Sequence, residues 1–292
     1  MDAWNTIARR VAEASGEPFD PMAPETLAGG CINSAFRLGD GKRTYFVKTN
    51  RAALLDMFEA EAAGLEALAD SHTLRVPRPV CTGTCEGLSF IVMEYLAPGR
   101  GSHRGWQLAG ERLAAMHRVS STHFGWSRDN TIGATPQTNT PNGDWIAFWR
   151  EQRLGFQLEL AARKGYGGRL QVLGSRLQER CPALLEHAPT ASLLHGDLWG
   201  GNLGFTDDGQ PMIYDPAVYF GDREADIAMT ELFGGFDSAF YAAYRASWPL
   251  DAGYPVRKQL YNLYHVLNHL NLFGGSYQGQ AERMMQALLA EC

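Results

Sequence analysis

The sequence has 292 residues, 45% of them hydrophobic and 20% charged, with a formal net charge of −6. This composition supplies a sizeable core, excludes a disordered chain, and fits two domains or one large two-lobed domain. Because the acidic balance contains no long run of one sign, it disfavours nucleic acid or an anionic membrane as the main partner.

The N-terminal third has the pattern of a sheet with two helices. Residues 1–16 read as a short amphipathic helix and not as a signal peptide, and no apolar run is long enough to span a membrane, so we predict a cytoplasmic protein. Strands joined by Gly-containing turns are expected within 25–50 and within 76–96, on either side of a helix over 54–69.

Helical patterns dominate from Trp106 onward. They are interrupted by an Asn/Thr/Pro/Gly-rich loop and a short β segment. The loop is expected at 127–143, the β segment at 192–215, and the helices at 145–164, 168–180, 222–233 and 257–273. The chain therefore predicts an N-terminal lobe over 1–93, a C-terminal lobe over 94–292, a hinge at 94–98, and a ligand cleft between the lobes.

The cysteines do not suggest a disulfide framework or a metal site. Five is an odd number at irregular spacing. Cys81 and Cys85 lack a second pair of ligands at zinc spacing. We therefore expect reduced thiols.

Glu61 stands where the helix over 54–69 should be apolar. Its apolar face runs through Leu54, Phe58 and Leu65, with Glu61 in the middle. A buried carboxylate needs a cationic partner, and Lys48, at the end of a strand, is the candidate. A purely structural ion pair would give the same pattern.

The segment 193–205 places polar residues in an apolar and Gly-rich context. His195, Asp197 and Asn202 match the kinase pattern H-x-D-x-x-x-x-N, and Asp215 follows at the end of a strand after a hairpin. An amide and a carboxylate supply the hard oxygen ligands that Mg²⁺ needs, and a nearby carboxylate can accept a proton from a hydroxyl acceptor. Together with Lys48, this arrangement predicts phosphoryl transfer.

These motifs resemble those of the fructosamine-3-kinase (ketosamine-3-kinase) family, a branch of the aminoglycoside-phosphotransferase-like and protein-kinase-like fold. The resemblance covers about residues 25–275. It rests on the motifs at 29–33, 46–48, 58–61, 195–202, 215–217 and 219–226, together with 152–154 and 272–275. The Asp-Leu-Trp-x-Gly-Asn form of 197–202 narrows the match from small-molecule kinases in general to this family. Gly200 stands where many relatives carry Ser.

The resemblance implies an α+β, two-lobed enzyme that uses ATP and Mg²⁺ to phosphorylate the 3-hydroxyl of a ketosamine, leading to deglycation. The acceptor would be a small ketosamine or a glycated protein lysine. Asp197 would be the catalytic base, with Asn202 and Asp215 as metal ligands. The implied nucleotide residues are Gly29, Gly30, Asn33 and Ser34 over the phosphates, Lys48 held by Glu61, and Met93, Glu94, Tyr95 and Leu96 at the hinge.

Other residues of these motifs allow two interpretations each. Trp199 is either a platform for the sugar ring or a packing residue. Cys31, in the glycine-containing loop, is either a redox-sensitive thiol or a buried small hydrophobe. His195 and Asp226 are expected to hold the loop that carries Asp197. His117 is expected to be a core histidine. Trp145, Trp149 and Arg153 share one helical face, which is expected to pack in the core; the alternative is that this face borders the acceptor pocket.

Two rival functions use the same residues. Another small-molecule kinase of this fold would act on an aminoglycoside, choline or homoserine, but the segment 257–275 is rich in Tyr, Asn, His and Leu and lacks the carboxylates that a polycation needs. A nucleotide-binding pseudokinase would normally lack one of Lys48, Asp197, Asn202 and Asp215. The preferred sugar, the kind of amine and the oligomeric state stay open.

Overall fold

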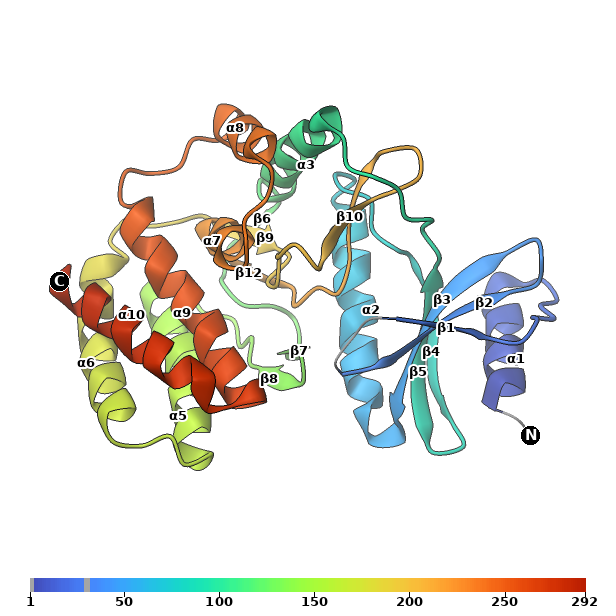
Figure 1. The fold of residues 1–292 in the computed structure, drawn as a ribbon, viewed down its shortest axis with the longest axis horizontal. Coiled ribbons are helices and arrows are strands. Elements are labelled where there is room, and N and C mark those ends of the chain that lie inside the picture. The colour runs from blue at the N-terminus through green and yellow to red at the C-terminus, as the bar shows by residue number, and fades with distance from the viewer. Residues whose placement is uncertain (1–2, 29–31) are drawn as a thin grey trace.

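The computed structural model describes residues 3–28 and 32–292, and it confirms the predicted α+β, two-lobed arrangement (Figure 1). The N-terminal lobe contains a five-stranded antiparallel sheet in the order β1-β2-β3-β5-β4. Its strands are β1 (Glu25–Leu27), β2 (Ser34–Gly39), β3 (Thr44–Arg51), β4 (Pro79–Cys85) and β5 (Leu88–Glu94).

One helix covers each face of this sheet (Figure 1). Helix α1 (Ala3–Ser15) packs on the face that carries Phe90 and Val92, and α2 (Leu55–Asp70) packs on the face that carries Ile91 and Met93. Because successive side chains of a strand point to opposite faces, β5 supplies both halves of the core. This explains the continuous apolar run over residues 90–93.

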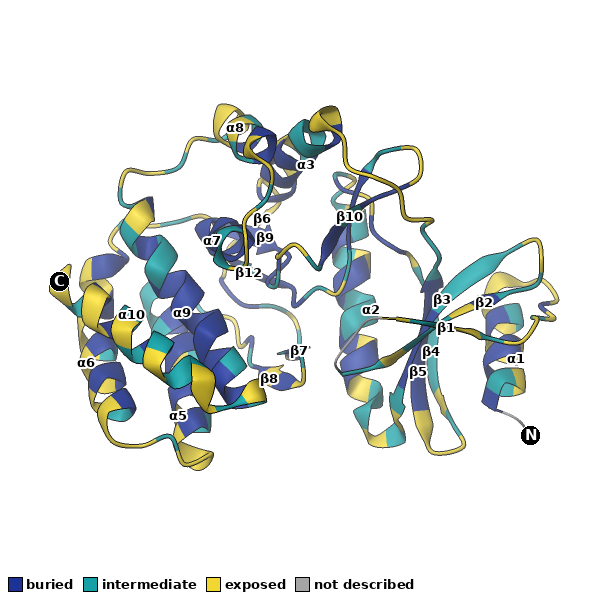
Figure 2. Cartoon of the chain, in the orientation of Figure 1, coloured by how far each residue is buried: buried dark blue, intermediate teal, exposed yellow. Residues whose placement is uncertain are grey.

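The C-terminal lobe is built around α9 (Tyr254–Phe273), which is buried along most of its length (Figure 2). Its other helices are α3 (His103–Met116), α4 (Trp145–Phe148), a π-helical segment (Trp149–Gly155), α5 (Phe156–Arg163), α6 (Arg169–Leu184), α7 (Glu224–Leu232), α8 (Ser238–Ser247) and α10 (Gln278–Ala290). Its strands are β6 (Ser120–Ser121), β7 (Asn130–Ile132), β8 (Thr135–Gln137), β9 (Ala191–Leu194), β10 (Leu203–Phe205), β11 (Pro211–Ile213) and β12 (Tyr219–Gly221). Short 3-10 turns precede α2 (Ala52–Leu54) and α10 (Gly275–Tyr277).

The lobes are joined by more than the hinge. One apolar core runs from Leu65 and Leu68 of α2 to Leu113 of α3 and Ile213 of β11. The segment after α2 also pairs with β11, since Ile213 N donates to Arg75 O at 2.9 Å. Helix α2, which carries Glu61, is therefore fixed against both lobes.

Several elements differ from the sequence-based expectations. The predicted loop over 127–143 contains the β7–β8 hairpin, and the single helix predicted over 145–164 is interrupted by the π-helical segment. The helix expected over 168–180 extends to Leu184, and helices α8 and α10 were not predicted.

None of the helices in the described part of the chain has both the length and the apolar character of a membrane span. Among the described cysteines, Cys81, Cys181 and Cys292 are free thiols.

Candidate active site

Lys48 lies at the centre of a charged triad that links the two lobes. Its ammonium donates to Glu61 Oε1 at 2.6 Å, as predicted from the position of Glu61 on α2, and it is also paired with Asp215. Burial alone would lower the pKa of Lys48, but the two carboxylates outweigh that effect and raise it. Lys48 therefore stays cationic, and α2 fixes the direction of its side chain.

The loop that follows β9 brings Asp197 and Asn202 together. Asn202 Nδ2 donates to Asp197 O at 2.8 Å, to Asp197 Oδ2 at 3.2 Å and to Asp215 O at 3.4 Å. Because Nδ2 makes these bonds, Oδ1 is the end of the amide that can face a cation. Burial and the negative charge of Asp215 raise the pKa of Asp197 to about 7, although the hydrogen bond from Asn202 opposes the shift.

His195 and Asp226 hold the backbone of this loop. Asp226 accepts hydrogen bonds from His195 N at 2.7 Å and Gly196 N at 2.9 Å. Burial lowers the pKa of His195, and its neutral ring donates from Nε2 to Tyr214 O at 3.0 Å, which leaves Nδ1 as acceptor for Asp197 N. Gly196 has φ +82°, and a Cβ there would lie 2.0 Å from Ala217 O. Two side chains and one glycine thus set the path of the chain before Asp197.

Asp226 in turn contacts His117, the residue that follows α3. His117 Nε2 lies 3.2 Å from Asp226 Oδ2, and its Nδ1 lies 2.8 Å from the Tyr244 hydroxyl of α8. Burial would raise the pKa of Asp226, but its hydrogen bond and charge interaction with His117 help to lower it. His117 is fully buried, as expected of a core histidine, and it connects α3 and α8 to the loop of Asp197.

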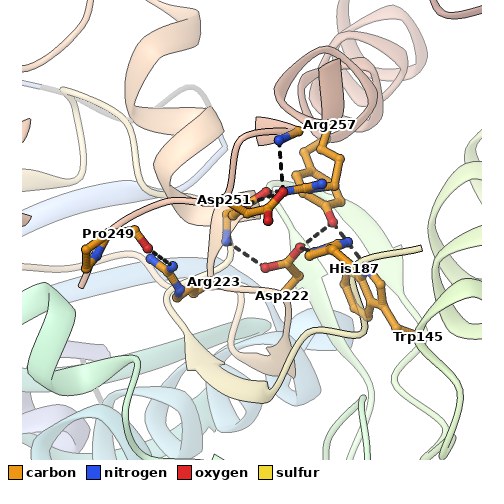
Figure 3. A network of polar contacts seen from close by, with 10 residues as sticks. Trp145, His187, Asp222, Arg223, Pro249, Asp251 and Arg257 are labelled. Carbon is orange, nitrogen blue, oxygen red and sulfur yellow. Dashed lines mark hydrogen bonds and ion pairs between the residues drawn. The ribbon is translucent and has the colours of Figure 1, made fainter. Parts of the chain in front are cut away.

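The start of α7, which carries Asp226, is fixed by a second polar network (Figure 3). Arg257 donates to both oxygens of Glu224, at 2.7 and 3.0 Å, and His187 Nε2 lies 2.6 Å from Asp222 Oδ2. His187, Asp222 and Glu224 are close enough to share a metal ion, with ligand atoms within 4.8 Å. Arg257 already supplies the cation, so this cluster is a structural support of α7.

We expect Asp226→Ala to lower the free energy of unfolding by about 2–4 kcal/mol, because it leaves the amide protons of His195 and Gly196 buried without an acceptor. Urea denaturation measures this loss. The control is Asp237→Ala, which removes an exposed helix cap that accepts from Ala239 N and should cost about 1 kcal/mol. Equal losses in the two variants would show that Asp226 does not support the loop in this way.

The glycine-containing loop is described only in part. Gly29, Gly30 and Cys31 lie outside the described residues. Asn33, just before β2, accepts a hydrogen bond from Asn50 Nδ2 at 2.7 Å, while Ser34 opens β2 and is exposed. Asn50 was not singled out from the sequence, and its place two residues after Lys48 on β3 is the signal that could have identified it.

At the hinge, Met93 is buried in the core and β5 ends at Glu94. Glu94 N already donates to Arg78 O at 2.8 Å, and the Glu94 side chain pairs with Arg75. Glu94 can therefore offer only its carbonyl to a ligand. The guanidinium carbon of Arg37 lies over the ring of Tyr95, 5.3 Å from the ring centroid. Leu96 follows outside any strand.

Trp199 lies at one end of a row of partly exposed aromatic rings. Its side chain is 39% exposed, and its ring meets Phe233 at a centroid distance of 6.3 Å. His269 of α9 lies 4.9 Å from Phe233 and 5.4 Å from Phe273. The structure thus places Trp199 on the surface of the site and not in the core. Phe233, which follows α7, and His269 of α9 were missed because they lie far from Trp199 along the chain.

Trp145, Trp149 and Arg153, by contrast, are buried in the C-terminal lobe. The guanidinium of Arg153 lies 4.1 Å from the ring centroid of Tyr219, and Arg153 donates to Asn139 Oδ1 at 2.7 Å. The packing role expected for these three residues is confirmed.

Comparisons with known proteins identify the family of this chain. Residues 3–291 match the family described as fructosamine kinase. A probable ketoamine kinase of Synechocystis is 49% identical, covering 98% of this chain and 97% of its own, and the chloroplastic protein-ribulosamine 3-kinase of Arabidopsis thaliana is 45% identical over 88% and 79%.

The solved structures give the same result. A putative fructosamine-3-kinase of Haemophilus somnus superposes with a TM-score of 0.90 at 32% identity, covering 98% of this chain and 97% of the other. An aminoglycoside phosphotransferase, 16% identical with a TM-score of 0.64 and covering 97% and 98%, shares the fold. With a family match over nearly its whole length, the chain belongs to the fructosamine kinase family.

Proposed function

We propose that this protein transfers the γ-phosphoryl group of ATP to the 3-hydroxyl of a ketosamine, a sugar joined to an amine as a fructosamine or ribulosamine. The observation that carries the proposal is the meeting of Asp197, Asn202 and Asp215 beside the Lys48–Glu61 pair, in a chain of this family. Release of the amine from the phosphorylated product would make the reaction a deglycation.

Asp197 is the base in this proposal. Its carboxylate takes the proton of the sugar hydroxyl while the hydroxyl oxygen forms a bond to the γ-phosphorus. The bond from that phosphorus to the bridging oxygen breaks, and its electron pair leaves with ADP. A pKa of about 7 suits this task, since a base that titrates near the working pH is both ionised and able to hold the proton.

The remaining charged residues fit a nucleotide and a magnesium ion. Magnesium prefers hard oxygen donors. The half-exposed carboxylate of Asp215 and the side-chain oxygen Oδ1 of Asn202 are donors of this kind. When bound, the ion would neutralise charge on the phosphates. Lys48, oriented by Glu61, would contact the α- and β-phosphates, the loop of Gly29, Gly30, Asn33 and Ser34 would cover them, and the main chain of Glu94, Tyr95 and Leu96, beside Met93, would hold the adenine.

Trp199 would form one wall of the acceptor site. Its exposed ring stands two residues after Asp197, and indole faces stack well on the apolar faces of sugars. The segment 257–275, which carries His269 and Phe273 of this row, contains no carboxylate, which argues for a ketosamine and against a polycationic aminoglycoside.

We expect Trp199→Ala to raise the KM for the ketosamine about tenfold while leaving the KM for ATP unchanged, since stacking of one aromatic ring contributes about 1 kcal/mol or more. Trp199→Phe keeps a flat ring and should recover most of the loss. Steady-state kinetics with each substrate varied in turn give both constants. Equal changes in the two KM values would argue against a role confined to the acceptor.

The function itself is tested with a panel of acceptors. ATP consumption is measured with fructosamine and ribulosamine derivatives of free amino acids and of a lysine-containing protein, and with an aminoglycoside, choline and homoserine. Phosphorus NMR of the product locates the new phosphoester. Turnover of ketosamines with phosphate on the 3-hydroxyl supports the proposal, and preferential turnover of another acceptor overturns it. The cytoplasmic location and the redox sensitivity of Cys31 stay predictions.

A further inference from the structure

The β7–β8 hairpin occupies an unusual place between the lobes (Figure 1). It spans Asn130 to Gln137, its first strand contacts α2, and its second contacts α9. Asn268 of α9 donates to Ile132 O at 3.4 Å. The hairpin therefore touches the helix that holds Glu61 and the helix that holds His269.

Buried side chains anchor the base of the hairpin beside the catalytic residues. Asn130 Nδ2 donates to Val218 O at 2.8 Å, and Gln137 Nε2 donates to Ala217 O at 3.1 Å. Both carbonyls follow Asp215 by two or three residues. The Tyr264 hydroxyl of α9 donates to Gln137 Oε1 at 2.6 Å. Buried and hydrogen-bonded amides of this kind make the hairpin a rigid part of the C-terminal lobe.

Gly133 lies in the turn of the hairpin and faces two branched side chains, one from each lobe. A Cβ added at Gly133 would lie 3.1 Å from Cδ1 of Ile32, just after the glycine pair of the N-terminal lobe, and 3.2 Å from Cδ1 of Leu272, near the end of α9. Gly133 also has φ +60°, a conformation that suits glycine. The short distances to Ile32 and Leu272 and the positive φ angle both favour glycine at position 133.

Ile32 and Leu272 lead directly to the two substrate sites. Asn50 Nδ2 donates to Ile32 O at 3.0 Å and to Asn33 Oδ1, so the position of Ile32 sets the position of the residues that would cover the phosphates. Leu272 precedes Phe273 and lies one helical turn after His269, at the end of the aromatic row. A shift of either side chain is therefore passed to one substrate site.

We propose that Gly133 is a positioning residue whose lack of a side chain sets the approach of Ile32 and Asn33, which precede β2, to the acceptor end of α9. The expected effect on acceptor binding rests on the proposed function. The expected effect on nucleotide binding does not, because nucleotide affinity can be measured without an acceptor.

The primary test is Gly133→Ala, measured by titration with a non-hydrolysable ATP analogue and Mg²⁺ and by steady-state kinetics with a ketosamine. The added methyl group must displace Ile32 and Leu272 by a few tenths of an ångström, and we expect the nucleotide Kd and the acceptor KM each to rise about threefold to tenfold. Gly168→Ala is the control for backbone strain, because Gly168 also has φ +60° but no atom within 4 Å of its added Cβ. It should leave both constants unchanged.

Rescue distinguishes positioning from general damage. In the Gly133→Ala background, Ile32→Val removes the methyl group that meets the new Cβ and should restore the nucleotide Kd alone. Leu272→Val should restore the acceptor KM alone. If Gly133→Ala does not fold, Gly133→Asn carries the same Cβ on a residue that tolerates positive φ.

Unchanged constants in the Gly133 variant, or rescue of neither constant by its own partner, would overturn the proposal. If the wild-type protein does not act on ketosamines, the proposed function fails, but selective rescue of nucleotide affinity by Ile32→Val still decides the role of Gly133 at the loop.

Discussion

Asp197→Asn should reduce kcat on the order of 10²–10⁴-fold, the loss typical of a missing general base, and leave the affinity for ATP nearly unchanged. The substitution preserves the shape of the side chain and an oxygen that can still accept from Asn202 Nδ2, 3.2 Å away in the wild type. It removes the group that takes the acceptor proton, and it leaves Lys48 and Asp215 in place. Single-turnover kinetics report the chemical step, and titration with an ATP analogue reports binding.

A matched control for this variant is Asp207→Asn, which changes an exposed carboxylate at the β10–β11 turn of the same lobe. It should keep full activity. A kcat of Asp197→Asn within a few-fold of the wild-type value would show that Asp197 is not the base, regardless of the result for the control. A parallel loss of nucleotide affinity would indicate that the loop itself had moved.

The parts of the site that the sequence predicts well are those with fixed local spacing. His195, Asp197 and Asn202 lie on one loop, so their separation along the chain limits their separation in space. Glu61 was identified because a carboxylate interrupts the apolar face of a helix, and its partner Lys48 lies 2.6 Å away. In both cases a local pattern carries the information.

The parts that were missed depend on contacts between distant segments. The β7–β8 strands are three residues each, and their pairing depends on Asn130 and Gln137 reaching the carbonyls of Ala217 and Val218. A loop-like composition conceals such strands, because buried amides give no hydrophobic periodicity. The π-helical segment of 149–155 has the same apolar spacing as an ordinary helix, so it cannot be distinguished from one by its sequence pattern.

Helices α8 and α10 failed to stand out for a different reason. Only three residues of α10, Ala281, Met285 and Leu288, are buried, although they recur at helical spacing. In α8, alanines and aromatic residues occupy both faces, so its sequence does not indicate which face is buried. In each case it is packing against α9 or α3 that defines which face is buried.

Asp215→Ala should lower the rate of phosphoryl transfer on the order of 10²–10³-fold and raise the Mg²⁺ concentration needed for half-maximal activity, because it removes a charged oxygen ligand where charge develops in the transition state. Stability should change by about 1 kcal/mol or less, since the side chain is 49% exposed and Lys48 keeps Glu61 as its partner. A magnesium titration of the rate and a thermal melt measure the two effects.

Asp215→Asn is the matched variant, because Asp215 has φ +57°, and asparagine tolerates this conformation better than alanine does. Asparagine also keeps one oxygen donor without the charge. We therefore expect the rate to fall in the order wild type, Asn, Ala, with the magnesium requirement rising in the same order and the melting temperature of the Asn variant close to that of the wild type. If activity in both variants followed the melting temperature and the magnesium requirement did not move, Asp215 would be a structural partner of Lys48 and not a metal ligand.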